Sequence, residues 1–140
     1  MATPAPEYQD KFVAFIDVLG FKQLIEQSSA GVGEPLSEVL ALLRTFGTQN
    51  ERSLFQQYGP TLCPCSTAIN RNLDFRLTQI SDCVIVSSEV SPAGVINLLS
   101  HCTKIVVGCL IKGVMCRGYV TSGAIFHTDT QVIGTGYQAA

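Results

Sequence analysis

Two aspartates, Asp17 and Asp82, each stand at the end of an apolar run and are candidates for metal chemistry. Asp17 follows the run Phe12 to Ile16. Asp82 lies in a tight turn between Leu73–Ile80, an alternating segment with one apolar face, and the apolar segment Cys83–Val86. Because a lone buried carboxylate is very costly, each acid must lie at an exposed strand end or be neutralised by a cation. Two Mg²⁺ or Mn²⁺ ions held by such a pair are the usual apparatus for chemistry at a phosphorus atom. The alternative is that both acids only form turns or caps.

The segment after Asp17 favours a phosphate ligand. Gly20 permits a close backbone approach, and Phe21 to Gln27 predicts a helix whose first N–H groups point back toward Asp17. The carboxylate, the glycine and the helix N-terminus together predict a place for metal-bound phosphate.

The apolar patterns predict the elements that must position these residues. The expected order is β-α-α-β-β-α-β-β, an α+β fold with a ferredoxin-like antiparallel sheet, helices on one face and the other face free for pairing. In this topology the first strand and the central hairpin are neighbours, which puts Asp17 and Asp82 at the same edge of the sheet. Besides the segments above, we expect helices over Pro35–Gln49, near Glu51–Gln57 and from Ser91 to Lys112, and strands over Val114–Phe126 and Gln131–Ile133.

Composition bounds the class of protein. The chain has 140 residues, enough for one domain over 1–140, and 14% charged residues against about 25% in typical soluble domains. We therefore expect a partner to cover much of the surface, most simply a second copy. The net charge of −2 argues against duplex nucleic acid as a ligand. With no leader pattern, and with Val95 to Ile111 too short and polar for an easy membrane span, we expect a soluble, cytoplasmic protein with no membrane partner.

The six cysteines do not require a disulfide scaffold. Most lie in apolar runs, where a reduced cysteine acts as a small hydrophobe. Cys63-Pro64-Cys65 lies in a loop-like segment and is interpreted as ordinary loop thiols, with part of a zinc site as the alternative.

Four motifs occur in the order typical of one enzyme family. The segments Phe15-Ile-Asp-Val-Leu-Gly-Phe21, Ile80-Ser-Asp-Cys83, Arg117-Gly-Tyr-Val-Thr-Ser-Gly123 and Gly134-Thr-Gly-Tyr-Gln-Ala-Ala140 resemble those of class III nucleotidyl cyclase catalytic domains. Within that class the chain looks most like the bacterial pyrimidine (uridylate and cytidylate) cyclases of antiphage defence. The resemblance covers nearly the whole chain from Phe12 onward.

The resemblance implies a site and a reaction. Asp17 and Asp82 would bind two Mn²⁺ or Mg²⁺ ions with help from the Val18 carbonyl. The backbone of four successive residues would hold the triphosphate of a ribonucleoside triphosphate: Leu19, Gly20, Phe21 and Lys22. The ribose 3′-oxygen would attack the α-phosphorus, closing a cyclic nucleotide and releasing pyrophosphate. Such enzymes are head-to-tail homodimers with both sites at the subunit interface.

The chain also departs from the family at its base-reading positions. These fall near Thr78 and Gln131, which carry neither the lysine–aspartate pair expected for adenine nor the glutamate–cysteine pair expected for guanine. A hydroxyl and an amide suit a uracil or cytosine edge, among other partners. Gln138 stands where the family has a ribose-orienting asparagine. The arginine expected one turn later falls beyond Ala140, so we expect a domain that lacks its C-terminal segment.

Other interpretations remain open at this point. The chain could be a non-catalytic nucleotide-binding or dimerisation module of the same fold, or a structural domain whose acids only cap turns. Arg117 could face the phosphate, although a strand arginine paired with a nearby acid is the favoured interpretation. We expect a structural role for His101, and His127 is expected at a turn where it could titrate near neutrality.

Overall fold

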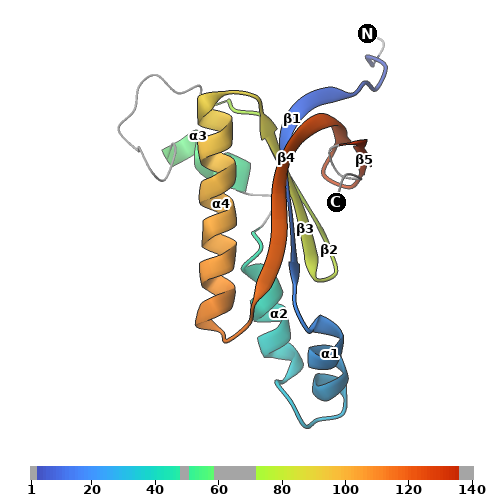
Figure 1. Cartoon of the computed structure of the whole chain (residues 1–140), viewed down its shortest axis with the longest axis vertical. Coiled ribbons are helices and arrows are strands. Elements are labelled where there is room, and N and C mark those ends of the chain that lie inside the picture. Colours follow the sequence, from blue (N-terminus) through green and yellow to red (C-terminus); the bar gives the residue numbers. More distant parts are fainter. Residues whose placement is uncertain (1–2, 48–50, 59–71, 136–140) are drawn as a thin grey trace.

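One antiparallel sheet of five strands organises the molecule, with the strand order β2-β3-β1-β4-β5 (Figure 1). The computed structural model describes residues 3–47, 51–58 and 72–135. Strand β1 lies at the centre, between β3 and β4. The strands are β1 (Gln9–Val18), β2 (Phe75–Ile80), β3 (Cys83–Glu89), β4 (Cys116–His127) and β5 (Val132–Gly134).

Helices cover one face of this sheet, as the sequence predicts. The helices are α1 (Phe21–Ser29), α2 (Leu36–Arg44), α3 (Glu51–Tyr58) and α4 (Pro92–Ile111). Side chains of α2 and α4 pack with the even-numbered residues of β1 in the main core, which includes Ala14, Ile16, Leu42, Val84, Leu98 and Ile105. Figure 1 shows α2 and α4 on the same side of the strands. The expected α+β class, with an antiparallel sheet and helices on one face, is therefore confirmed.

The opposite face carries the odd-numbered residues of β1 and a smaller cluster. Val13, Ile85 and Ile125 are buried there, and Phe15 packs against them. The rings of Phe15 and Tyr119 stack across β1 and β4 with centroids 5.7 Å apart. Asp17 belongs to the same face because side chains alternate along a strand.

The ends of α4 follow the expected signals. Ser91 caps the helix by accepting a hydrogen bond of 3.0 Å from the Gly94 amide, and Gly113 follows the last turn with φ of 75°. Proline in the first turn and a left-handed glycine after the last are the ordinary chemistry of helix termini.

Several boundaries differ from the expectation. Strand β1 runs from Gln9 to Val18, so Asp17 lies inside the strand rather than after it. Helix α2 ends at Arg44, earlier than expected. Glycines inside a strand indicate a bulge or a close backbone contact; β4 pairs with β1 through Gly118 and Gly123 without a bulge, and Gly118 lies close to the Phe15 carbonyl. The short helix expected near residue 51 is confirmed as α3. The Cys63-Pro64-Cys65 segment lies outside the described residues.

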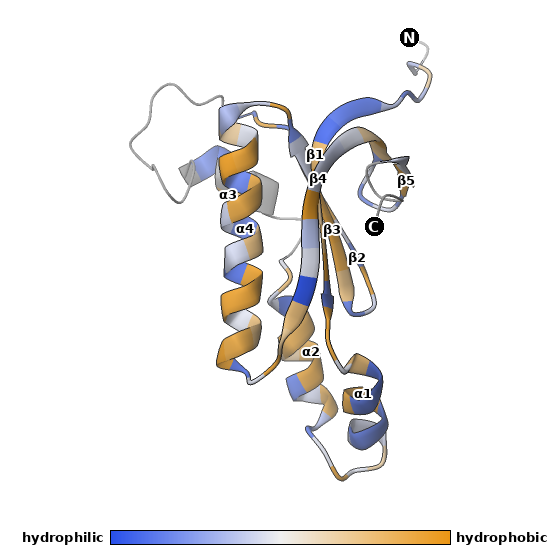
Figure 2. Cartoon of the chain, in the orientation of Figure 1, coloured by the Kyte–Doolittle hydropathy of each residue, from blue (hydrophilic) through white to orange (hydrophobic). Residues whose placement is uncertain are grey.

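Apolar residues recur along the whole length of helix α4 (Figure 2). Its inner side buries Leu98, His101 and Ile105, whereas its outer side exposes large apolar side chains: Ile96, Leu99, Val106, Val107, Leu110 and Ile111. With 20 residues it is a candidate membrane span by length and composition, of which 28% is buried. The expectation that this segment is too short and too polar for an easy membrane span is therefore wrong by length and composition. One such helix is weak evidence for a membrane span, and α4 also packs with its inner side on β1 and β3.

Candidate functional site

The fold brings Asp17 and Asp82 to the same end of the sheet. The backbone amide of Val18 donates a 3.2 Å hydrogen bond to the Asp82 carbonyl oxygen. Asp17 is also the cross-strand partner of Cys83, the residue that follows Asp82. The predicted neighbourhood of the two acids is thus confirmed.

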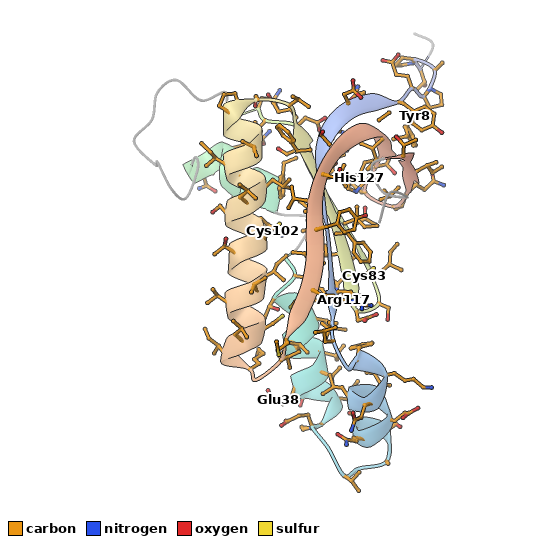
Figure 3. All side chains as sticks on the ribbon, viewed as in Figure 1. Tyr8, Glu38, Cys83, Cys102, Arg117 and His127 are labelled. Carbon is orange, nitrogen blue, oxygen red and sulfur yellow. The ribbon has the colours of Figure 1, made fainter. Side chains whose placement is uncertain are left out.

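The pKa of the Cys83 thiol is raised by burial and by both acids. Burial raises its pKa, and the nearby carboxylates of Asp82 and Asp17 raise it further, in that order. A thiolate beside two carboxylates would be repelled by both, so Cys83 stays protonated near neutral pH. Figure 3 shows Cys83 near Arg117, on the half of the sheet toward α1. The carboxylates of Asp82 and Asp17 both lie close enough to Cys83 to act on its charge.

Arg117 lies beside Asp17 on the adjacent strand. Its Nε is 3.0 Å from Oδ1 and 3.4 Å from Oδ2 of Asp17, and its Nη2 is 3.4 Å from Oδ2. The Asp17 side chain is 18% exposed and that of Arg117 is 72% exposed. The favoured interpretation of Arg117, a strand arginine paired with a nearby acid, is confirmed. The residues face each other because Asp17 and Arg117 are direct partners in the β1–β4 register.

The turn after β1 presents backbone toward this edge. Gly20 precedes α1 in the left-handed conformation, with φ of 72° and ψ of 19°, and no side chain caps the helix. The Leu19 amide donates a 2.9 Å hydrogen bond to the Met115 carbonyl, which fixes the turn against the start of β4. A hollow of about 500 Å³ adjoins it, lined by Val18, Leu19, Gly20, Gln23, Leu24, Gln27, Gly113, Val114 and Met115. Neither Asp17 nor Asp82 lines this hollow. The first amides of α1 carry no side-chain cap, and their binding of an anion beside the acids stays a prediction.

Phe21 and Lys22 take different positions in this turn. Phe21 is partly buried and packs against the main core. The Lys22 side chain is 90% exposed, and its Nζ lies 3.9 Å from Oε1 of Glu26. A surface pair of this length holds the lysine weakly, so its ammonium can reach a ligand at the helix N-terminus.

The donor set fits a cation that shares its shell with a ligand. Within the described ranges, no group of three or more His, Cys, Asp or Glu side chains is placed to hold a metal ion. Two carboxylates alone make an incomplete shell, and Mg²⁺ commonly completes such a shell with water and substrate phosphate. The Arg117 guanidinium already occupies a cation's position at one of the carboxylates. The site therefore fits a metal ion that arrives with a phosphate ligand better than a closed structural metal site.

The predicted base-reading residues lie around another turn. Thr78 is buried, and its hydroxyl donates a 3.0 Å hydrogen bond to the Thr128 carbonyl. Gln131 is exposed and closes the same turn, since its backbone amide donates a hydrogen bond to Oγ1 of Thr128 at 3.1 Å. The structure thus brings Thr78 near Gln131, but the proton of the Thr78 hydroxyl is already used. Gln138 lies outside the described residues.

A buried hydrogen-bond chain next to Thr78 was not predicted from the sequence. His127 Nε2 lies 2.8 Å from Oγ1 of Thr78, and its Nδ1 lies 2.6 Å from Oγ of Ser87. Because Thr78 donates to a carbonyl, the imidazole has Nε2–H donating to Thr78 and Nδ1 accepting from Ser87. Burial, followed by the positive charges of Lys11 and Arg76, lowers the His127 pKa to about 4. The expectation that His127 titrates near neutrality is wrong, because the histidine ends a buried strand.

His101 has the expected structural role. It is buried on the inner side of α4, with Nε2 3.0 Å from the Phe46 carbonyl oxygen and its ring edge-on to Phe75. These contacts tie α4 to the end of α2 and to β2.

Two solved structures of a bacterial light-regulated adenylyl cyclase resemble this fold. They superpose with TM-scores of 0.60 and 0.61, at 17% and 18% sequence identity. Each match covers 99% of this chain and 40% of the neighbour's chain. No protein-family model and no curated protein matches the sequence. At this identity the likeness shows the fold alone: an adenylyl cyclase-like fold of the class III type.

Proposed function

We propose that this chain is the catalytic domain of a metal-dependent nucleotidyl cyclase that acts on a ribonucleoside triphosphate. The observation that carries the proposal is that Asp17 and Asp82 lie at the same end of the sheet, both near Cys83, beside an uncapped helix N-terminus in an adenylyl cyclase-like fold. The reaction would be attack of the ribose 3′-oxygen on the α-phosphorus, with closure of a 3′,5′-cyclic nucleotide and release of pyrophosphate.

The chain's own residues would divide this task. Asp17 and Asp82, with the Val18 carbonyl, would hold Mn²⁺ or Mg²⁺, and the backbone from Leu19 to Lys22 would bind the triphosphate. When bound, the metal ions would activate the attacking hydroxyl and neutralise charge on the leaving phosphates. Gln138 would orient the ribose.

We propose a pyrimidine nucleotide, UTP or CTP, as the favoured substrate. The support is the sequence resemblance to bacterial pyrimidine cyclases and the neutral side chains at Thr78 and Gln131. A buried threonine whose proton is engaged offers a base only a lone pair, which suits the N3–H of uracil or the amino group of cytosine. The cyclic product would serve as a signal in antiviral defence inside the cytoplasm.

We further propose that the active form is a homodimer with its sites at the interface. Its support is the low charge content and the many exposed apolar side chains, which a partner would cover. Light scattering over a concentration series should give twice the chain mass; a monomer at concentrations that support turnover would contradict the dimer.

Incubation with each of the four ribonucleoside triphosphates and Mn²⁺ tests the reaction. We expect pyrophosphate release with UTP or CTP, and loss of that release in Asp17→Ala and in Asp82→Ala while both variants keep their circular dichroism spectra. Cyclic product formed at the wild-type rate by both variants would rule the assignment out. Nucleotide binding without turnover would instead favour a non-catalytic module of the same fold.

A further inference from the structure

The ion pair between Asp17 and Arg117 joins a largely buried carboxylate to a largely exposed guanidinium. The carboxylate is 18% exposed and is held by strand β1, whereas the arginine side chain is 72% exposed. Three contacts between 3.0 and 3.4 Å occupy both carboxylate oxygens. The Asp17 carboxylate is therefore fixed in place, whereas the Arg117 side chain can rotate away into solvent.

The same carboxylate is the proposed metal ligand. A guanidinium and a divalent cation repel each other, and they cannot both take the two oxygens of one side chain at bonding distance. Asp82 adds a second negative charge at this edge, so one positive charge does not neutralise the pair of acids. A divalent cation is therefore attracted to the two carboxylates more strongly than the guanidinium is. The exposed Arg117 side chain can move away when such a cation binds.

We propose that Arg117 is a positioning residue that holds the Asp17 carboxylate while no metal ion is bound and is displaced when one binds. The proposal rests on the proposed function, since it assumes that Asp17 binds metal. Arg117 acts through Asp17: it keeps the carboxylate oriented at the site, and it competes with the ion. Exposed ion pairs of this kind are weak, so displacement should reduce the affinity for Mn²⁺ by only about two- to five-fold.

A merely structural pair would behave differently. If the contact served only to join β1 to β4, its loss would change folding stability and leave the intrinsic affinity for Mn²⁺ unchanged. The ladder between these strands already spans Gln9 to Val18, so the pair is not needed to join them. The affinity for the free ion is thus the property that separates the two roles.

The test is calorimetric titration of the full chain with Mn²⁺, without nucleotide, for the wild type, Arg117→Gln and Arg76→Gln. Arg76→Gln is the matched control: it removes the same charge, but its ion pairs are with Asp74 and Asp129, not with Asp17. We expect Arg117→Gln to bind Mn²⁺ about two- to five-fold more tightly than the wild type. Arg76→Gln should match the wild type, and Arg117→Lys, which keeps the charge but loses the forked contact, should fall between them.

The outcomes separate this proposal from the proposed function. Equal or weaker Mn²⁺ binding by folded Arg117→Gln would overturn the displacement of Arg117 and leave the metal site intact. Equal tightening in Arg117→Gln and Arg76→Gln would also overturn it, because the effect would then come from net charge. No Mn²⁺ binding by any of the folded proteins would overturn the metal site itself, and this proposal with it.

Discussion

The amide of Val18 donates its hydrogen bond to the carbonyl oxygen of Asp82, at 3.2 Å, and thereby ties the end of β1 to the tip of the β2–β3 hairpin. One backbone bond thus fixes the distance between residues that are far apart in the sequence. Because the contact is made by backbone, side-chain changes at Asp17 and Asp82 can remove charge without releasing the strands. This separation makes the site testable by substitution.

Gly20 supplies the left-handed residue between Asp17 and α1, so its replacement tests the turn. A Cβ added at this position would have no atom within 4 Å, and the cost of a side chain is therefore conformational. We expect Gly20→Ala to lower the free energy of unfolding by about 1–2 kcal/mol. Gly20→Asn should cost less, because asparagine tolerates this conformation. Urea denaturation measures both; an alanine variant as stable as the asparagine variant would contradict the explanation.

Gly118 allows β4 to approach β1 next to Arg117. A Cβ there would overlap the carbonyl oxygen of Phe15, which is backbone and cannot rotate away. We expect Gly118→Ala to cost about 3 kcal/mol or more, since the strands must separate. Gly113→Ala, at a left-handed position with open space around it, is the control and should cost about 1–2 kcal/mol. Equal losses of unfolding free energy in the two variants, measured by thermal or urea unfolding, would show that the close approach of β4 to β1 does not require glycine at position 118.

His127 should make the fold sensitive to mild acid. Its pKa is lowered to about 4 by burial and by the charges of Lys11 and Arg76, partly offset by Asp74 and Asp129. Between the folded value and the ordinary value near 6.5, the unfolded chain binds a proton that the folded chain does not, so stability falls as the pH falls. From pH 7 to pH 5 this should cost about 2 kcal/mol.

The control for this acid sensitivity is His127→Gln. Glutamine can still bond to Ser87 and Thr78 but does not titrate, so the variant should lose less stability than the wild type between pH 7 and pH 5. The measurement is the free energy of unfolding in urea at each pH. Parallel pH profiles for the two proteins would contradict a buried neutral histidine.

The juxtaposition of the acids was predictable because it follows from local patterns. Apolar runs ending in Asp17 and Asp82 define two strand ends, and hairpin topology makes those strands neighbours. The extent of β1 was not predictable in this way. Lys11 looks like a polar boundary in the sequence, but it is buried in the strand because its Nζ meets Asp74 at 3.0 Å. Asp74 lies in another part of the chain, so the local pattern around Lys11 does not predict this ion pair.

The hydrogen bonds of Thr78 were unpredictable for the same reason, because their partners come from a distant part of the chain. Alternation along β2 does not say what lies above the sheet, and the hydroxyl is engaged because β4 brings His127 and Thr128 over it. The pairing of Arg117 with Asp17 lies between these cases. The sequence favoured a nearby acid for this arginine, and only the β1–β4 register identifies which acid it is.

Removal of either carboxylate should abolish metal binding with little effect on stability. In Asp17→Asn the chain loses its ion pair with Arg117, an exposed contact worth at most about 1 kcal/mol. In Asp82→Asn the backbone bond to Val18 remains, and asparagine suits a turn as well as aspartate does. We therefore expect unfolding free energies within about 1 kcal/mol of the wild type for both variants.

For Mn²⁺ the same two variants should differ sharply from the wild type, because each keeps the shape of the site and loses one of its two charges. Calorimetric titration should detect no binding by either variant at concentrations that saturate the wild type. Asp10→Asn removes an equal charge from an exposed position at the far end of β1 and should bind Mn²⁺ normally. Wild-type binding by Asp82→Asn, with binding lost only in Asp17→Asn, would mean that a single acid holds the ion. The carboxylate pair would then have no shared role.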